Sequence, residues 1–207
     1  MNESSQNPRF LNRRTMLRSM LVAAVAVPLA ACTVTEDPLA KQARSGDNKN
    51  YIAGDGAVEE YAVEKRTEPI EINSKTYQGT TVDLSAMRGK PVVLNFWYAA
   101  CAPCRIEAPH LKELSEKFGD KVPFIGVNVR DEAEASQAFE RTFEIPYESI
   151  QDTDGQIQLA MTKYVPLQAV PSTLVLDRKG RVRARVIGAV DPKILETLID
   201  TALTEEL

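Results

Sequence analysis

The sequence PVVLNFWYAACAPCR occupies residues 91–105 of this 207-residue chain and joins two unlike segments. Residues 92–98 are almost continuously apolar and β-prone, which is typical of a strand covered on both faces of a parallel sheet. Cys101 and Cys104 follow at once, beside the start of a helical pattern that runs over 103–118. The sequence therefore predicts a buried strand that leads directly into a helix, with both cysteines at the junction.

Strand and helix patterns alternate on both sides of this junction. The period of the apolar residues and the turn residues between them define the elements. The expected strands are 70–72, 81–84, 92–98, 122–129, 149–151, 172–177 and 181–187. The expected helices are 103–118, 132–142, 156–164 and 192–206. This alternation, which ends in a hairpin and a helix, predicts an α/β domain with helices on both faces of a mixed central sheet.

The cysteine pair is the centre of the predicted chemistry. Cysteines three positions apart at a helix start lie close enough to form a disulfide. The partial positive charge of the helix N-terminus favours the thiolate form of the first cysteine. Cys101 is then the nucleophile in thiol-disulfide exchange, and Cys104 resolves the mixed disulfide. A purely stabilising disulfide is the alternative, but so short a loop removes little entropy from the unfolded chain.

The composition argues against a metal site. The chain has one histidine and three cysteines, which is too few to complete a zinc shell around Cys101 and Cys104. We therefore expect no metal, and no cofactor other than the redox-active disulfide Cys101–Cys104.

The N-terminal residues have the features of an export signal. An arginine pair at 13–14, in a run that resembles the twin-arginine motif, precedes the apolar run 20–31, which is too short to span a bilayer. The sequence LAAC that ends at Cys32 resembles a bacterial lipobox. We therefore expect residues 1–31 to be a signal peptide and Cys32 to carry the lipid anchor. A cysteine inside an ordinary cleaved signal is the alternative.

The residues after the predicted signal are mostly polar. Residues 32–66 contain few large apolar side chains and no clear period, so we expect a flexible linker ahead of a folded domain over 67–207. Residues 1–31 hold four arginines and one glutamate, whereas the whole chain has a net charge of −4. The remainder is therefore acidic, which argues against nucleic acid as a partner. We expect the protein at the extracytoplasmic face of the cell membrane.

The residues around the cysteines resemble those of a known family. The run RGKPVVLNFWYAACAPCR at 88–105, with Glu107 after it, is similar to the TlpA/ResA-type thiol-disulfide oxidoreductases of the thioredoxin superfamily, and the resemblance covers roughly 67–207. It implies a thioredoxin fold with an extra N-terminal hairpin and a central helix-strand insertion, which match the elements expected at 70–84 and 132–151. It also implies an exported enzyme held at a membrane.

The resemblance also assigns site residues. Val170-Pro171 matches the cis-proline that lies opposite the dithiol and offers backbone to a bound partner, with a trans proline at an edge strand as the alternative. Glu107 matches a helix glutamate that handles the proton of Cys104, with an ordinary solvated glutamate as the alternative. Trp97 is expected to pack beneath the site, and we group it with Val170 and Pro171 as substrate-binding.

One position departs from thioredoxin itself. Asn95 stands where thioredoxins have a buried aspartate that accepts a proton, and an amide does not titrate. Proton handling is therefore expected to differ from that of thioredoxin.

The resembling family usually reduces disulfides in exported proteins, for example apocytochrome c or copper-site assembly proteins, with electrons from a membrane thiol-disulfide protein. An extracytoplasmic oxidase would use the same residues and would differ only in the reduction potential of the cysteine pair.

A peroxiredoxin is disfavoured because Tyr98 stands where a threonine is expected. A copper-carrying lipoprotein would need a wider cysteine spacing and a ligand histidine elsewhere than His110. A purely structural lipoprotein predicts that Cys101→Ala abolishes no exchange activity.

Overall fold

The computed structural model describes residues 50–53 and 56–207. The predicted signal peptide 1–31, the predicted lipidation site Cys32 and the first part of the predicted linker lie outside these residues. Within the described ranges, no helix combines the length and the apolar character needed to cross a membrane.

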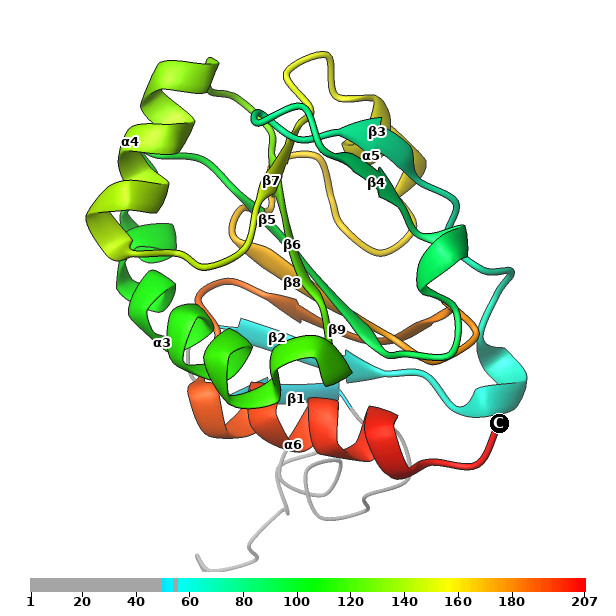
Figure 1. The fold of residues 1–207 in the computed structure, drawn as a ribbon. Helices are drawn as coiled ribbons and strands as arrows, with labels where there is room; N and C mark the ends of the chain where they lie inside the picture. Colours follow the sequence, from blue (N-terminus) through cyan, green and yellow to red (C-terminus); the bar gives the residue numbers. More distant parts are fainter. Residues whose placement is uncertain (1–49, 54–55) are drawn as a thin grey trace, which may run out of the picture. The chain divides into compact units, whose positions relative to one another are not determined.

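A seven-stranded mixed sheet forms the centre of the described domain (Figure 1). Its strands in spatial order are β1 (Asn50–Ala53), β2 (Gly56–Glu60), β9 (Val182–Ile187), β8 (Ser172–Leu176), β5 (Val92–Trp97), β6 (Phe124–Asn128) and β7 (Ser149–Gln151). Strands β5, β6 and β7 run parallel to one another, and every pair from β5 through β8, β9 and β2 to β1 is antiparallel. The mixed sheet predicted from the sequence is confirmed.

Helices and a small hairpin cover the two faces of this sheet. The remaining elements are β3 (Asn73–Lys75), β4 (Thr81–Asp83), α3 (Ala102–Phe118), α4 (Ala133–Phe143), α5 (Gln156–Ala160) and α6 (Pro192–Thr204). Helices α3 and α6 lie together on one face (Figure 1), where Leu111 and Leu195 share a core with Val93. The β3–β4 hairpin and α5 lie over the other face, where Val82 packs with Leu94.

Strand β5 supplies side chains to both cores. All six of its residues are buried. Val92, Leu94 and Phe96 point into the core beneath the β3–β4 hairpin, whereas Val93 points into the core beneath α3 and α6. A strand covered on both faces must be apolar at successive positions rather than at alternate ones. This explains the continuous apolar run and confirms the predicted strand.

Two of the expected elements differ from the structure. The first strand of the hairpin is β3 at 73–75 and not 70–72, because Ile70 and Ile72 are core side chains of the segment that leads into it. Helix α5 ends at Ala160 and not at Tyr164. Tyr164 is 5% exposed and packs into the same core from the turns that follow the helix. In both places the local apolar pattern correctly predicted that the residues are buried, but it predicted the wrong type of secondary structure.

The folded region also begins earlier than the predicted boundary at residue 67. Strand β2 lies within the predicted linker and pairs antiparallel with β9, with Val58 opposite Val186. Val58 is 3% exposed and belongs to the core beneath α3 and α6. The described domain therefore includes part of the segment 32–66, which lacks a long periodic pattern but contributes two strands, β1 and β2, to the sheet beside β9.

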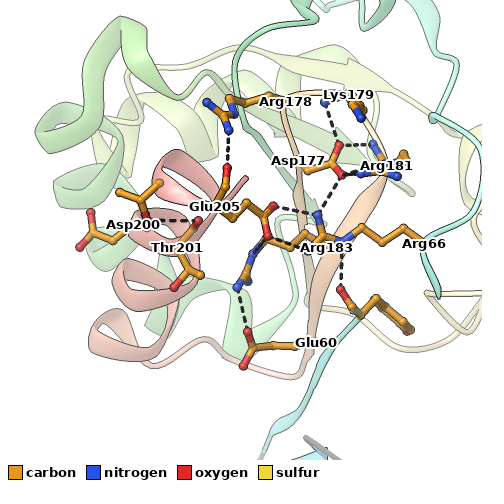
Figure 2. Close-up of polar contacts among 12 residues, drawn as sticks. Glu60, Arg66, Asp177, Arg178, Lys179, Arg181, Arg183, Asp200, Thr201 and Glu205 are labelled. Carbon is orange, nitrogen blue, oxygen red and sulfur yellow. Dashed lines mark hydrogen bonds and ion pairs between the residues drawn. The ribbon is translucent and has the colours of Figure 1, made fainter. Parts of the chain in front are cut away.

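A buried ion cluster ties this early segment to the C-terminus (Figure 2). The Arg66 side chain is 3% exposed and donates 2.9 Å to Asp177 and 2.8 and 2.7 Å to the two carboxylate oxygens of Glu205. Arg183 donates to Glu60 at 2.9 Å and lies 3.4 Å from Glu205. Paired, two-pronged contacts of this kind are the strong form of charge-assisted hydrogen bond. Arg66 is thus a structural residue of the domain rather than part of a linker.

Candidate active site

The two cysteines lie at the junction between the end of β5 and the start of α3. Cys101 is the N-cap residue of α3, and it is joined to Cys104 by a disulfide with a Cα–Cα distance of 5.3 Å. The backbone N–H of Cys104 donates to Sγ of Cys101 at 3.2 Å. A helix N-terminus leaves such N–H groups without partners inside the helix and carries a partial positive charge. The same donor therefore favours a thiolate at Cys101 once the disulfide is reduced.

A second loop closes over the disulfide from β8. Strand β8 runs antiparallel to β5 and places Ser172 opposite Phe96, so the chain just before β8 reaches the cysteine end of β5. The Val170–Pro171 peptide bond is cis. Sγ of Cys101 lies 4.0 Å from the carbonyl oxygen of Val170. The sheet topology thus brings together two parts of the chain that are 69 residues apart.

Glu107 is buried one helical turn after Cys104. It is 1% exposed, and its two carboxylate oxygens accept hydrogen bonds from Asn95 Nδ2 and from the backbone N–H of Val190, both at 2.9 Å. Burial raises the pKa of Glu107 from 4.5 to about 7, although both hydrogen bonds oppose this shift. The alternative of an ordinary solvated glutamate is therefore wrong. Positions three apart on a helix share one face, so Glu107 and Cys104 are buried on the same side of α3.

Trp97 lies beneath the disulfide, in a cluster that also holds Cys101 and Cys104. Its ring centroid is 4.4 Å from that of Phe139 on α4, and its indole N–H donates to Ser149 Oγ at 3.1 Å. Backbone of the neighbouring strand approaches closely here, because a Cβ built on Gly126 would lie 2.8 Å from the indole nitrogen. The inserted elements α4 and β7 therefore fix the position of the ring.

Comparison with known proteins gives the family. The family model described as "AhpC/TSA family" matches residues 66–185, which is more than half of the chain. The chain belongs to the AhpC/TSA family. The match begins at Arg66, the residue that the structure places in the buried ion cluster.

Three relatives show what kind of AhpC/TSA protein this is. The thiol-disulfide oxidoreductase ResA of Oceanobacillus iheyensis is 26% identical over 94% of this chain and 89% of its own length. A DsbF homologue from Corynebacterium diphtheriae has 35% identity and a TM-score of 0.63, over 70% of this chain and 92% of that one. A secreted thiol-disulfide isomerase from Corynebacterium glutamicum has 27% identity and a TM-score of 0.67, over 75% and 98%. The protein is a thiol-disulfide oxidoreductase with a thioredoxin-like fold.

Asp131 is a residue of this AhpC/TSA site that the sequence analysis missed. Its Oδ2 accepts from the backbone N–H of Ala99 at 2.5 Å and from Asn128 Nδ2 at 2.9 Å. Asp131 lies just after the end of β6, and through Ala99 it fixes the loop that joins β5 to Cys101. A signal for it exists in the topology, because β5 and β6 run parallel and polar residues that follow neighbouring parallel strands meet at one edge of the sheet.

The AhpC/TSA site offers no cluster of metal ligands. In the described part of the chain, no group of three or more histidine, cysteine, aspartate or glutamate side chains is arranged to hold a metal ion. The side chains of Asn95 and Glu107 are hydrogen-bonded to each other, and Glu107 and Asp131 also accept from backbone N–H groups.

Proposed function

We propose that this protein reduces disulfide bonds in exported proteins by dithiol-disulfide exchange, with Cys101 as the nucleophile and Cys104 as the resolving cysteine. The observation that carries the assignment is the position of Cys101 as the N-cap of α3, with a backbone N–H donor 3.2 Å from its sulfur. Cys104 lies inside the first turn of α3, and its sulfur is bonded to that of Cys101. Each is 2% exposed.

The exchange proceeds in two balanced steps. The thiolate of Cys101 attacks one sulfur of the substrate disulfide, which forms a mixed disulfide and releases the other substrate sulfur as a thiolate that takes up a proton. The thiolate of Cys104 then attacks the Cys101 sulfur, forms the Cys101–Cys104 disulfide and releases the second substrate thiol. Two electrons and two protons pass to the substrate, and a membrane thiol-disulfide protein must supply two further electrons and protons to reduce the enzyme again.

Glu107 is proposed to accept the proton of Cys104 in the second step. A base works best when its pKa is near the operating pH, and burial brings the pKa of Glu107 to about 7. Its position one turn after Cys104 on the buried side of α3 supports this role. Asn95 cannot titrate, but its amide stabilises the ionised Glu107 by donating to Oε1 at 2.9 Å.

The substrate is proposed to bind along the loop before β8. The carbonyl oxygen of Val170 lies 4.0 Å from the Cys101 sulfur, so backbone that pairs with Val170 would present its cysteine directly to Cys101. Pro171 follows, and the peptide bond between Val170 and Pro171 is cis. Trp97 supports the disulfide from below, within the same cluster.

We further propose that residues 1–31 are a signal peptide, that Cys32 is lipidated, and that a short linker then leads to the domain at the extracytoplasmic face of the membrane. The secreted relative supports export. The described strands start at residue 50, so the linker is shorter than the sequence predicts. Apocytochromes c and copper-site assembly proteins are the proposed substrates.

The reduction potential of the Cys101–Cys104 pair tests the direction of electron flow. The full-length chain is equilibrated with glutathione and thioredoxin buffers, and the thiols are trapped and counted. A potential of about −270 mV or lower supports a reductase, whereas a value near about −120 mV would overturn it in favour of an oxidase. Cys104→Ala should then trap mixed disulfides with its substrates, and Cys101→Ala is the matched control that should trap none.

A further inference from the structure

Two exposed arginines contact the loop between β5 and Cys101, and among the described residues neither forms an ion pair with an acidic side chain. Arg105 follows Cys104 on α3, and Arg130 follows β6; both side chains are exposed. In the part of the chain that the structure describes, neither has a carboxylate within 4.0 Å, whereas Arg66 and Arg183 each pair with acidic residues. The chain as a whole has a net charge of −4. The positive charges of Arg105 and Arg130 are therefore opposite in sign to the net charge of the chain.

Aromatic rings hold both arginines in place. The guanidinium carbon of Arg105 lies 5.1 Å from the ring centroid of Phe143, and that of Arg130 lies 4.0 Å from the ring centroid of Tyr98. Arg105 also donates to the carbonyl oxygen of Ala99 at 3.4 Å, so both arginines are anchored to the loop that leads into Cys101. A guanidinium stacked by its face on a ring keeps donors at its edge, where they can bind a carboxylate with two parallel hydrogen bonds.

The nearby acidic residues are already occupied. Asp131 accepts from the Ala99 and Asn128 N–H groups at 2.5 and 2.9 Å. Glu132 accepts from Gln151 at 3.2 Å. Within the described residues, neither Asp131 nor Glu132 therefore accepts a hydrogen bond from Arg105 or Arg130.

Exposed apolar side chains adjoin the same site. Ile106 is 67% exposed on α3, and it shares the outer side of the helix with Ala102, four positions before it, which is also exposed. Leu167 is 51% exposed in the loop that leads to Val170. Large apolar side chains beside a reactive centre are suited to contact a partner.

We propose that the substrate segment of this enzyme is apolar and acidic: acidic side chains next to its cysteine bind Arg105 and Arg130, while apolar side chains contact Ile106 and Leu167. This inference rests on the proposed exchange function and adds the chemical class of polypeptide that the site selects. Opposite charges across such an interface act on the rate of encounter and on the choice of partner more than on affinity alone.

Disulfide-containing peptides that differ at two positions test this preference. The peptides carry Glu, Gln or Lys on either side of the cysteine and are otherwise identical, and the rate constant for oxidation of the reduced full-length protein is measured with each. Exposed charge pairs have small individual energies, so we expect the Glu peptide to react about tenfold faster than the Lys peptide at low salt. The ratio should shrink strongly in 1 M salt, where the screening length falls to about 3 Å.

Matched variants separate local from overall charge. The double variant Arg105→Gln/Arg130→Gln should bring the Glu-to-Lys ratio close to one. The control Lys90→Gln/Lys121→Gln removes the same charge from exposed residues at the opposite end of β5 and β6, and should keep the ratio. Because a ratio is compared, any change in the intrinsic reactivity of Cys101 cancels. Arg105→Lys/Arg130→Lys keeps the charges and should keep most of the preference, even if the loss of stacking alters stability.

The outcomes distinguish this inference from the proposed function. Exchange that proceeds equally fast with the Glu, Gln and Lys peptides would overturn the acidic preference and leave the oxidoreductase assignment intact. A preference that survives in the double glutamine variant would also overturn it, since the selecting charges would then lie elsewhere. An absence of exchange with every peptide would instead count against the proposed function.

Discussion

Replacing Glu107 with glutamine tests whether one buried carboxyl governs how stability depends on pH. Glu107 is 1% exposed and accepts from Asn95 and from the backbone of Val190. Burial raises its pKa from 4.5 to about 7. One step of pKa corresponds to about 1.36 kcal/mol, so ionising this group costs about 3 kcal/mol more in the folded chain than in the unfolded chain.

The sign of the effect follows from the direction of the shift. A carboxyl with a raised folded-state pKa binds its proton more tightly when the chain is folded, so its contribution to stability is fully present below about pH 4.5. That contribution is lost as the pH rises through about 7. The wild-type protein should therefore lose about 3 kcal/mol of unfolding free energy from this group between pH 4 and pH 8.

Glutamine mimics the protonated carboxyl and cannot ionise. Its carbonyl oxygen can accept from the Val190 N–H, and its amide can donate to Asn95 after the Asn95 side chain turns over. We expect Glu107→Gln to match the wild type within about 1 kcal/mol near pH 4.5 and to exceed it by about 3 kcal/mol at pH 8, where the wild type holds a buried charge.

Guanidinium unfolding of the oxidised protein at a series of pH values measures this difference. Glu113→Gln is the matched control, because it removes an exposed carboxylate from the same helix and should follow the wild-type profile. Glu140 and Asp152 also have pKa values raised by burial, but they are present in all three proteins and cancel in the comparison. Profiles of wild type and Glu107→Gln that run parallel from pH 4 to pH 8 would refute the reasoning.

Two further predictions concern packing and the ion cluster. Arg66→Met leaves Asp177 buried without one of its cations and should lower the unfolding free energy by about 3–5 kcal/mol, whereas Lys117→Met in an exposed ion pair should cost at most about 1 kcal/mol; urea unfolding of both variants gives the comparison, and equal losses would contradict it. Gly126→Ala places a Cβ 2.1 Å from Ser149 Oγ and should destabilise the domain by about 1–3 kcal/mol, visible as a lower Tm, while an unchanged Tm would mean that the strand shifts without cost.

Much of the fold follows from local patterns that the structure preserves. The continuous apolar run at 92–97 identified the central strand because a strand with cores on both faces has no other composition available to it. Position in the chain was sufficient to place Cys101 and Cys104 at the start of α3. Both inferences rest on residues within one strand and one helical turn.

What the sequence left open depends on contacts between distant residues. Arg66 pairs with Asp177 and Glu205, which lie 111 and 139 residues further along the chain, so no local pattern could distinguish it from a solvated arginine in a linker. Ile70 and Tyr164 show the related problem: each is buried, and burial by itself does not specify a strand or a helix. At such positions the type of element is set by contacts with distant parts of the chain and not by neighbouring residues.

Asn95 on β5 stands where thioredoxins have an aspartate, and its contact with Glu107 on α3 explains why an amide fits this position. The side chain of Asn95 lies 2.9 Å from a carboxylate oxygen of Glu107. An aspartate at position 95 would bring a second carboxyl to the same buried site, and two carboxylates at that distance cannot both ionise near neutral pH. An amide there instead donates to Glu107 at 2.9 Å and to Thr173 Oγ1 at 3.2 Å, and it adds no second titratable group. At the contact between β5 and α3, the carboxyl is therefore carried by Glu107 on the helix that bears the cysteines, and Asn95 on the strand stabilises its charged form.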